Sequence, residues 1–177
     1  FIHQCTEIGF GSLGIVAIIS VFIGAVSTIQ TAYQLVSPLI PPSTIAQIVR
    51  DTVILEFAPT LVCIVLAGVA GSRIASELGN MRVSEQIDAL EIMGIKTKTY
   101  LILPKICAAL IMIPLLVVMA MALGIWGGRL AGVASGIISG SIYDKGLLEF
   151  FVPFNVIFAL IKAYVFAFII SSIPAFY

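Results

Sequence analysis

The sequence predicts an all-α integral membrane protein, a polytopic helical bundle. Its 177 residues are 60% hydrophobic and only 10% charged, whereas soluble domains carry roughly 25% charged residues. Apolar stretches long enough to cross a bilayer as helices, which takes about twenty residues, recur along the chain. No segment alternates with the period of two that a membrane β-barrel requires, so helices are the expected spanning elements.

Four membrane spans are expected, at about residues 11–33, 52–74, 100–126 and 153–173. The whole chain, 1–177, is interpreted as a single domain. It opens without a methionine and stops directly after an apolar run, so we expect it to be truncated at both ends. Glycines between residues 124 and 136, and the pair Gly68 and Ser72, are expected to let helices pack closely.

A charged segment, residues 73–98, separates the second span from the third. It holds eight of the eighteen Asp, Glu, Lys and Arg residues of the chain. Val83, Ile87 and Leu90 recur at helical spacing, while the acidic residues fall on another side. The pattern predicts a short amphipathic helix within this segment.

Three residues are expected to shape this helix. Gly79 weakens the preceding helix and should let the chain turn along the membrane surface. Ser84 is a plausible N-cap, and Gly94 can supply a left-handed stop. A solvated surface loop is the alternative to such an exposed helix.

Basic residues predict the orientation of the chain. Arg73, Arg82, Lys96, Lys98 and Lys105 lie in or beside the charged segment, whereas the first connection, residues 37–51, has only one basic residue, Arg50. By the positive-inside rule the charged segment is expected to be cytoplasmic. Because spans alternate in direction, both ends of the chain are expected on the same side.

Two ionisable residues lie within the predicted spans. Lys162 is too deep in the fourth span for its side chain to reach the interface, and a charge at the bilayer centre costs about 2.5–3.5 kcal/mol. Asn155 lies one heptad earlier on the same face, and Glu56 enters the second span from the same side. Lys162 and Glu56 either pair with each other or both meet a lipid headgroup.

Motifs of catalysis and metal binding do not stand out. The sequence has no HExxH, GxSxG or CxxC, and its three cysteines are widely spaced. We therefore expect no catalytic residue, no metal site and no enzyme activity. The net charge is zero, so no nucleic-acid partner is expected. The chain also lacks the GxxxxGK[ST] pattern that cradles the phosphates of ATP.

Four segments carry a resemblance to one family. ELGNMRVSEQIDALEIMG at 77–94 resembles the signature of the MlaE-type permeases, the membrane subunits of ABC transporters that work with MCE-domain lipid-binding proteins. EFAP at 56–59 resembles the family's ELGP, and YLILPK at 100–105 resembles its YLVLPR. LIKAYVFAF at 160–168 is similar to its lysine-containing later span. The family usually has arginine before the glutamate of ELGP, where this chain has Leu55.

The resemblance implies a permease subunit that moves phospholipids between the inner membrane and a periplasmic MCE-domain lipid carrier. It implies a multi-pass protein of the cell inner membrane and a homodimer. No cofactor is expected on this chain, because ATP and magnesium would bind a separate ABC ATPase subunit.

The resemblance also identifies residues 77–93 as the cytoplasmic coupling helix that docks on the ATPase. The residues expected at that contact are Glu77, Leu78, Gly79, Met81, Arg82, Val83, Glu85, Gln86, Asp88, Ala89 and Leu90. The residues expected to line a lipid cavity are Glu56, Asn155 and Lys162.

A proton-coupled secondary transporter of an amphiphilic solute is the alternative function, because Glu56 and Lys162 are placed to titrate within the membrane. The sequence shows neither an inverted repeat nor paired, glycine-broken helices, which many such transporters have. A scaffolding subunit is a third possibility. Co-purification with an ATPase separates the three.

Overall fold

The computed structural model describes residues 2–35, 41–94 and 97–176, with side chains for all of these except 2–4, 98–99 and 176. Within these ranges the regular structure is entirely helical, which confirms the predicted fold class. The elements are α1 (Ile2–Gln34), α2 (Ser43–Thr52), the π-helix η1 (Val53–Leu61), α3 (Val62–Val83), α4 (Gln86–Ile92), α5 (Thr97–Ala134), α6 (Gly140–Leu148) and α7 (Pro153–Phe176).

Four helical runs of the described chain are long and apolar enough to cross a membrane, as predicted. They are Cys5–Gln34, Ser43–Val83, Tyr100–Ala134 and Pro153–Ala175. The second run is the longest, with 41 residues, because α2, η1 and α3 follow one another without a break. It begins earlier than the predicted span, directly after Pro42, whose φ of −59° suits the start of a helix.

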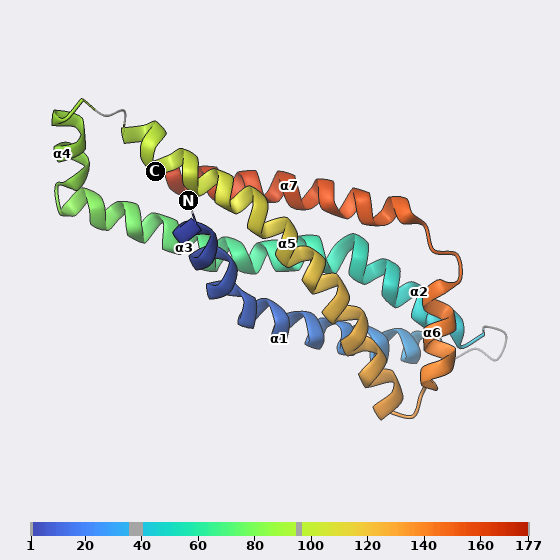
Figure 1. Cartoon of the computed structure of the whole chain (residues 1–177). Coiled ribbons are helices and arrows are strands. Elements are labelled where there is room, and N and C mark those ends of the chain that lie inside the picture. The colour runs from blue at the N-terminus through green and yellow to red at the C-terminus, as the bar shows by residue number, and fades with distance from the viewer. Residues whose placement is uncertain (1, 36–40, 95–96, 177) are drawn as a thin grey trace.

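The four runs lie side by side and alternate in direction, so the bundle has two ends (Figure 1). The first, which we call the α4 end, holds α4, the last turns of α3 and α7, and the first turns of α5. The second, which we call the α6 end, holds α2, α6 and the start of α7. The first and last described residues both lie toward the α4 end, in agreement with the expected alternation of the spans.

Helices α1 and α5 make the most extensive contact in the molecule, and that contact depends on glycines. A Cβ added to Gly24 would collide with the carbonyl oxygen of Gly124, and one added to Gly127 would lie 2.5 Å from that of Val21. Close backbone approach is a main source of contact between helices in lipid. The packing role expected for the later glycines is confirmed for Gly124, Gly127, Gly128 and Gly132, but not for Gly136, where no atom lies within 4 Å of an added Cβ. It was wrong for Gly68 within this chain, where no atom lies within 4 Å of an added Cβ.

Helix α7 packs on the bundle through a row of small side chains. Ala159, Ala163, Ala167 and Ser171 recur at every fourth position, which is one face of a helix, and all are 0% exposed. The row brings α7 against α3, α5 and η1. Lys162 lies beside this row and is thereby placed next to the irregular part of the second run.

Candidate docking surface and intramembrane site

The predicted coupling helix is divided into two elements. Helix α3 continues through Gly79, and α4 begins only at Gln86. The break lies between them, where Glu85 has a left-handed backbone with a φ of 57°. The hydroxyl of Ser84 donates to the carbonyl oxygen of Asn80 at 2.7 Å, so Ser84 ends α3. The predictions that Gly79 turns the chain and that Ser84 caps the next helix were therefore wrong.

Backbone energetics explain this difference. Glycine in a helix interior costs only about 1 kcal/mol relative to alanine, which does not break a long helix such as α3. A left-handed backbone at a residue other than glycine is uncommon, and no sequence pattern predicts it at Glu85. Gly94, with a φ of 76°, ends α4 as predicted.

The residues predicted to contact an ATPase all lie at this corner. On α3 are Glu77, Leu78, Gly79, Met81, Arg82 and Val83; in the turn is Glu85; on α4 are Gln86, Asp88, Ala89 and Leu90. Most of them are exposed, and the half-buried ones are Glu77, Leu78, Met81 and Leu90. The structure therefore brings these residues together as the surface of a corner between two helices.

Helix α4 runs across the end of the bundle and buries none of its residues (Figure 1). Large apolar side chains are exposed around it: Val83, Ile92 and Met93 are 85%, 87% and 66% exposed. Asp88 and Glu91 are exposed among them. We call the exposed side chains from Val83 to Met93 the α4 surface. Apolar groups gathered on an exposed surface are typical of a site of interaction.

A groove of about 730 Å³ lies beside α4, walled also by α3, α5 and the end of α7. Its lining is mainly apolar, with the charged side chains of Arg82, Asp88 and Glu91 among it. Thr97, at the start of α5, donates from its hydroxyl to Glu91 Oε1 at 3.1 Å. This bond ties the carboxyl end of α4 to α5. The groove lies between α4 and the rest of the bundle.

An ion pair joins α3 and α5 close to the groove. The ammonium nitrogen of Lys105 lies 2.8 Å from Glu77 Oε2, and the side chains are 3% and 39% exposed. From the sequence, Lys105 contributes to the charge bias and to the resemblance at 100–105, and Glu77 is a predicted docking residue, but no pairing between them is predicted. A lysine directly after Pro104 in an otherwise apolar helix was the available signal, because a charge in such a helix needs a partner.

The π-helix η1 contains a proline that explains it. Pro59 has no N–H, so the carbonyl of Leu55, four residues earlier, lacks its α-helical donor, and the proline ring crowds that carbonyl. A π-helix pairs each carbonyl with the N–H five residues on, which widens the turn around the ring. Lys162 of α7 donates from Nζ to the carbonyl oxygen of Leu55 at 3.1 Å.

The three predicted intramembrane residues are only partly brought together. The Lys162 ammonium also lies 4.9 Å from the centre of the Phe158 ring, a cation–π contact. It forms no ion pair with Glu56, whose side chain is exposed, although Glu56 directly follows the carbonyl that Lys162 binds. Asn155 is half-buried on α7. A contact of these side chains with a lipid headgroup stays a prediction.

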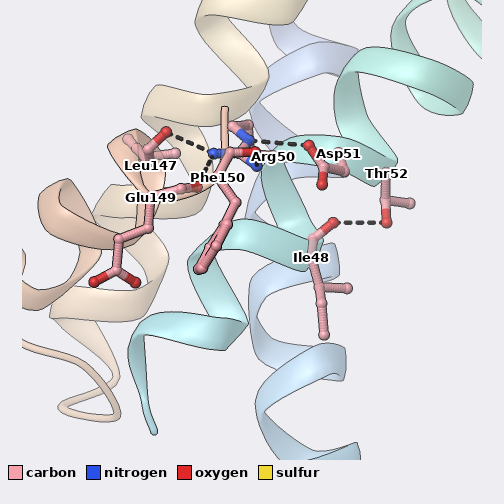
Figure 2. Close-up of polar contacts among 7 residues, drawn as sticks. All are labelled: Ile48, Arg50, Asp51, Thr52, Leu147, Glu149 and Phe150. Atoms are coloured by element: carbon pink, nitrogen blue, oxygen red, sulfur yellow. Dashed lines mark hydrogen bonds and ion pairs between the residues drawn. The ribbon is translucent and has the colours of Figure 1, made fainter. Parts of the chain in front are cut away.

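A buried arginine joins α2 to the segment after α6 (Figure 2). Arg50 is 2% exposed. Its Nη1 donates to the carbonyl oxygens of Leu147 and Glu149 at 2.7 and 2.9 Å, and its Nε donates to Asp51 Oδ1 at 2.9 Å. The last carbonyls of a helix have no donor within it, so a planar guanidinium with several N–H groups suits the end of α6.

The chain around Arg50 is held in an unusual conformation. Phe150 has a φ of 52°, which is uncommon for a large side chain. Arg50 Nη2 donates to the Phe150 carbonyl oxygen at 3.4 Å, and the guanidinium lies 5.5 Å from the centre of the Phe151 ring. Gln47 Nε2 donates to Glu149 Oε2 at 2.8 Å. Sequence reasoning noted Arg50 only as a basic residue of the first connection and missed these contacts.

A second polar link at the α6 end joins α5 to α6. Arg129 donates from Nε and Nη2 to the two carboxylate oxygens of Asp144, at 2.8 and 2.9 Å. Both side chains are well exposed, at 41% and 51%. The hydrogen bonds from Arg129 hold the pKa of Asp144 below its ordinary value.

Comparison with known proteins places these features in a family. The model of the permease MlaE family matches residues 1–177. The chain is 39% identical over 175 residues to a probable ABC transporter permease protein of Rickettsia bellii. It is 31% identical over 176 residues to the intermembrane phospholipid transport system permease protein MlaE of Haemophilus influenzae. Each alignment covers 99% of this chain and 67% of the relative.

A plant protein is also similar. Protein TRIGALACTOSYLDIACYLGLYCEROL 1, chloroplastic, of Arabidopsis thaliana is 33% identical over 172 residues, which is 97% of this chain and 49% of that protein. The chain thus spans about two thirds of the bacterial relatives and about half of the plant one. The family model covers the chain throughout, and the relatives exceed 30% identity along nearly all of it, so the chain belongs to the MlaE permease family.

Proposed function

We propose that the chain is the permease subunit of an ABC-type transporter that moves phospholipids between the inner membrane and a periplasmic MCE-domain lipid carrier. A separate ATPase subunit, which binds ATP and magnesium, drives the movement, and two copies of the permease form the membrane unit. Membership of the MlaE permease family supports this, as does a relative named for intermembrane phospholipid transport. The four candidate membrane spans suit a permease.

The α4 surface is the observation that carries the proposal. A helix of seven residues that buries none of them is too short to be stable by itself. Docking in a groove of an ATPase supplies the missing burial for Val83, Ile92 and Met93. Acidic groups beside them, such as Asp88, help to select a partner of complementary charge.

The connections of α4 suit the transmission of movement. Helix α4 follows α3 after a two-residue turn and is tied to α5 by the bond between Glu91 and Thr97. A displacement of the docked α4 is therefore passed to two membrane spans at once. Such a rearrangement changes the shape of a lipid cavity without any chemistry on this chain.

Basic residues support a cytoplasmic position for α4. Arg73, Arg82 and Lys105 lie on the last turns of α3 and the first turns of α5. Lys96, and the side chain of Lys98, lie outside the described residues. We expect a cysteine introduced at Asn80 to react with a membrane-impermeant thiol reagent from the cytoplasmic side only, and one at Ser139 from the outer side only. The reverse labelling would place α4 on the outer side of the membrane, where it could not contact the ATPase, and would contradict the proposed docking.

Lys162 is the proposed phosphate contact within the lipid cavity. It lies nine residues after Pro153, the first residue of α7, and is therefore roughly 13 Å from that end at 1.5 Å per residue. An ammonium has three N–H donors, and the hydrogen bond to Leu55 engages one of them. Another can meet a phosphate oxygen of a lipid. Glu56 and Asn155 would border the same site.

Charge reversal on α4 tests the proposal. The variant Glu85→Lys, Asp88→Lys changes exposed side chains only, so it should insert and fold as the wild type does. We expect its co-purification with the ATPase to fall about tenfold or more, as for the loss of close charge pairs at an interface, and ATP-driven lipid transport to fall with it. Asp144→Lys, an exposed acid at the α6 end, is the matched control and should keep both.

Two outcomes would contradict the proposal. If the variant Glu85→Lys, Asp88→Lys kept normal ATPase association and transport, the α4 surface would not be the docking site. Lipid transport that needs a proton gradient and proceeds without ATP would favour the secondary transporter instead.

A further inference from the structure

The position of α4 is controlled through the two helices that flank it. Its main contacts within the described chain are with α3 and α5, and none of its own residues is buried. The α4 orientation therefore depends on how the end of α3 lies relative to the start of α5. Anything that fixes this pair of helices also fixes α4.

Helices α3 and α5 have little direct contact of their own. Each of them packs far more extensively on α7 than on the other, and the groove of about 730 Å³ opens between their α4 ends. Direct packing between α3 and α5 therefore does little to fix their relative position, which depends on α7 and on contacts across the gap. A contact that joins the two helices directly gains importance there.

The Glu77–Lys105 ion pair is such a contact. Its 2.8 Å separation joins α3 to α5, and Leu78 and Leu101, which line the groove, lie one residue and one turn away from the two partners. Lys105 is 3% exposed, so leaving its ammonium unpaired is costly and alternative arrangements are disfavoured. Burial of Lys105 therefore favours the arrangement in which the two charges meet.

We propose that Glu77 and Lys105 are positioning residues: their ion pair holds the ends of α3 and α5 in the arrangement that presents α4 for docking, and carries α4 movement into both spans together. This inference rests on the proposed ATPase docking for its purpose. It also changes the role of Glu77, which acts through Lys105 rather than by touching the ATPase.

Glu77 and Lys105 differ in burial, so substituting one or the other should affect stability differently while affecting positioning equally. Glu77→Gln leaves a buried ammonium without its carboxylate, whereas Lys105→Met leaves a carboxylate that is 39% exposed and can be hydrated. Glu77→Gln should therefore lower the unfolding temperature more than Lys105→Met. Loss of positioning, by contrast, should be equal in the two variants, because either one removes the pair.

The first measurement uses the permease alone, in lipid nanodiscs. Spin labels are placed at Ala89 on α4 and Ile18 on α1, both exposed, in a background without Cys5, Cys63 and Cys107. Pulsed EPR should give a narrow distance distribution for the wild type and an equally broadened one for Glu77→Gln and Lys105→Met. The exchange Glu77→Lys, Lys105→Glu should narrow it again, and Asp144→Asn, which breaks the ion pair at the other end, should leave it unchanged.

The second measurement uses the complex with the ATPase. We expect both single variants to keep the ATPase bound but to move about tenfold less lipid per ATP hydrolysed, a change typical of coupling free energies between sites. The charge exchange should restore most of that ratio. The inference would be overturned if Lys105→Met kept the wild-type distance distribution and the wild-type ratio of lipid moved to ATP hydrolysed. It would also be overturned if Glu77→Gln, the variant expected to be less stable, showed clearly larger defects than Lys105→Met. Failure of the wild type to bind any ATPase would refute the proposed function, while the EPR result would still decide whether the pair positions α4.

Discussion

The two ends of the bundle hold their short helices differently. At the α6 end, Arg50 is 2% exposed and binds the carbonyls of Leu147 and Glu149, so α2 is fixed to the chain after α6. At the α4 end, α4 buries no residue, and a groove of about 730 Å³ lies behind it. The comparison teaches that the α6 end is tied together by a buried polar contact within the chain, whereas α4 is left exposed, as the proposed docking requires.

One helical run connects these two ends. The run Ser43–Val83 begins beside Arg50, contains η1 in its course and leads into α4. In the proposed coupling, a force applied at α4 would therefore act on a helical run whose first turns are held in place by Arg50. The irregular η1, supported by Lys162 from α7, lies between Arg50 and α4.

The largest effect should come from the α6 end. Arg50→Met removes a buried guanidinium and leaves the carbonyls at the end of α6 without donors. We expect the free energy of unfolding to fall by about 3 kcal/mol, since breaking a buried charged contact is strongly destabilising. Arg82→Met, an exposed arginine at the α4 end, should lower it by less than about 0.5 kcal/mol. Denaturant unfolding in detergent measures both, and equal losses would erase the contrast between the ends.

A smaller effect is expected midway between the ends. Lys162→Met removes the donor to the Leu55 carbonyl and should lower the free energy of unfolding by about 1–2 kcal/mol. Lipid transport should fall as well, with the ATPase still bound. Because Lys162 forms no ion pair with Glu56 in the structure, adding Glu56→Gln should restore neither property. Full recovery in the double variant would mean that the two residues serve only each other.

The smallest effect concerns the exposed ion pair of the α6 end. Arg129 lowers the pKa of Asp144, so the pair stabilises the fold above the ordinary aspartate pKa of about 4 and loses this contribution as pH falls through the lowered value. The unfolding temperature of Asp144→Asn should lie slightly below that of the wild type at pH 7, with the gap closing below about pH 4. A gap that widens in acid would contradict the sign of this linkage.

The spans were predictable because bilayer thickness fixes their length, and because backbone polar groups without hydrogen bonds are so costly in lipid that the spans must be helical. Gly94 was also predictable, because a left-handed helix stop favours glycine. Glu85 was not, since its left-handed backbone follows from where α3 and α4 must join. The sequence therefore located the corner but placed its turn several residues too early.

The candidate intramembrane site shows a similar limit. Sequence reasoning brought Lys162 close to Glu56, and the structure puts the lysine on the backbone carbonyl of Leu55, the neighbouring residue. The carbonyls that Arg50 binds are equally invisible in a sequence, because every residue has one. Side-chain patterns predict partners among side chains, and these contacts are made with backbone.

Hydrogen exchange of the reconstituted permease, with and without its ATPase, tests the central claim most directly. The claim is that the α4 surface docks the ATPase while the α6 end takes no part in that contact. We predict that adding the ATPase protects the backbone amides of α4, residues 86–92, and leaves those of α6, residues 140–148, unchanged. Protection confined to the α6 end, or none at α4 in an intact complex, would contradict it.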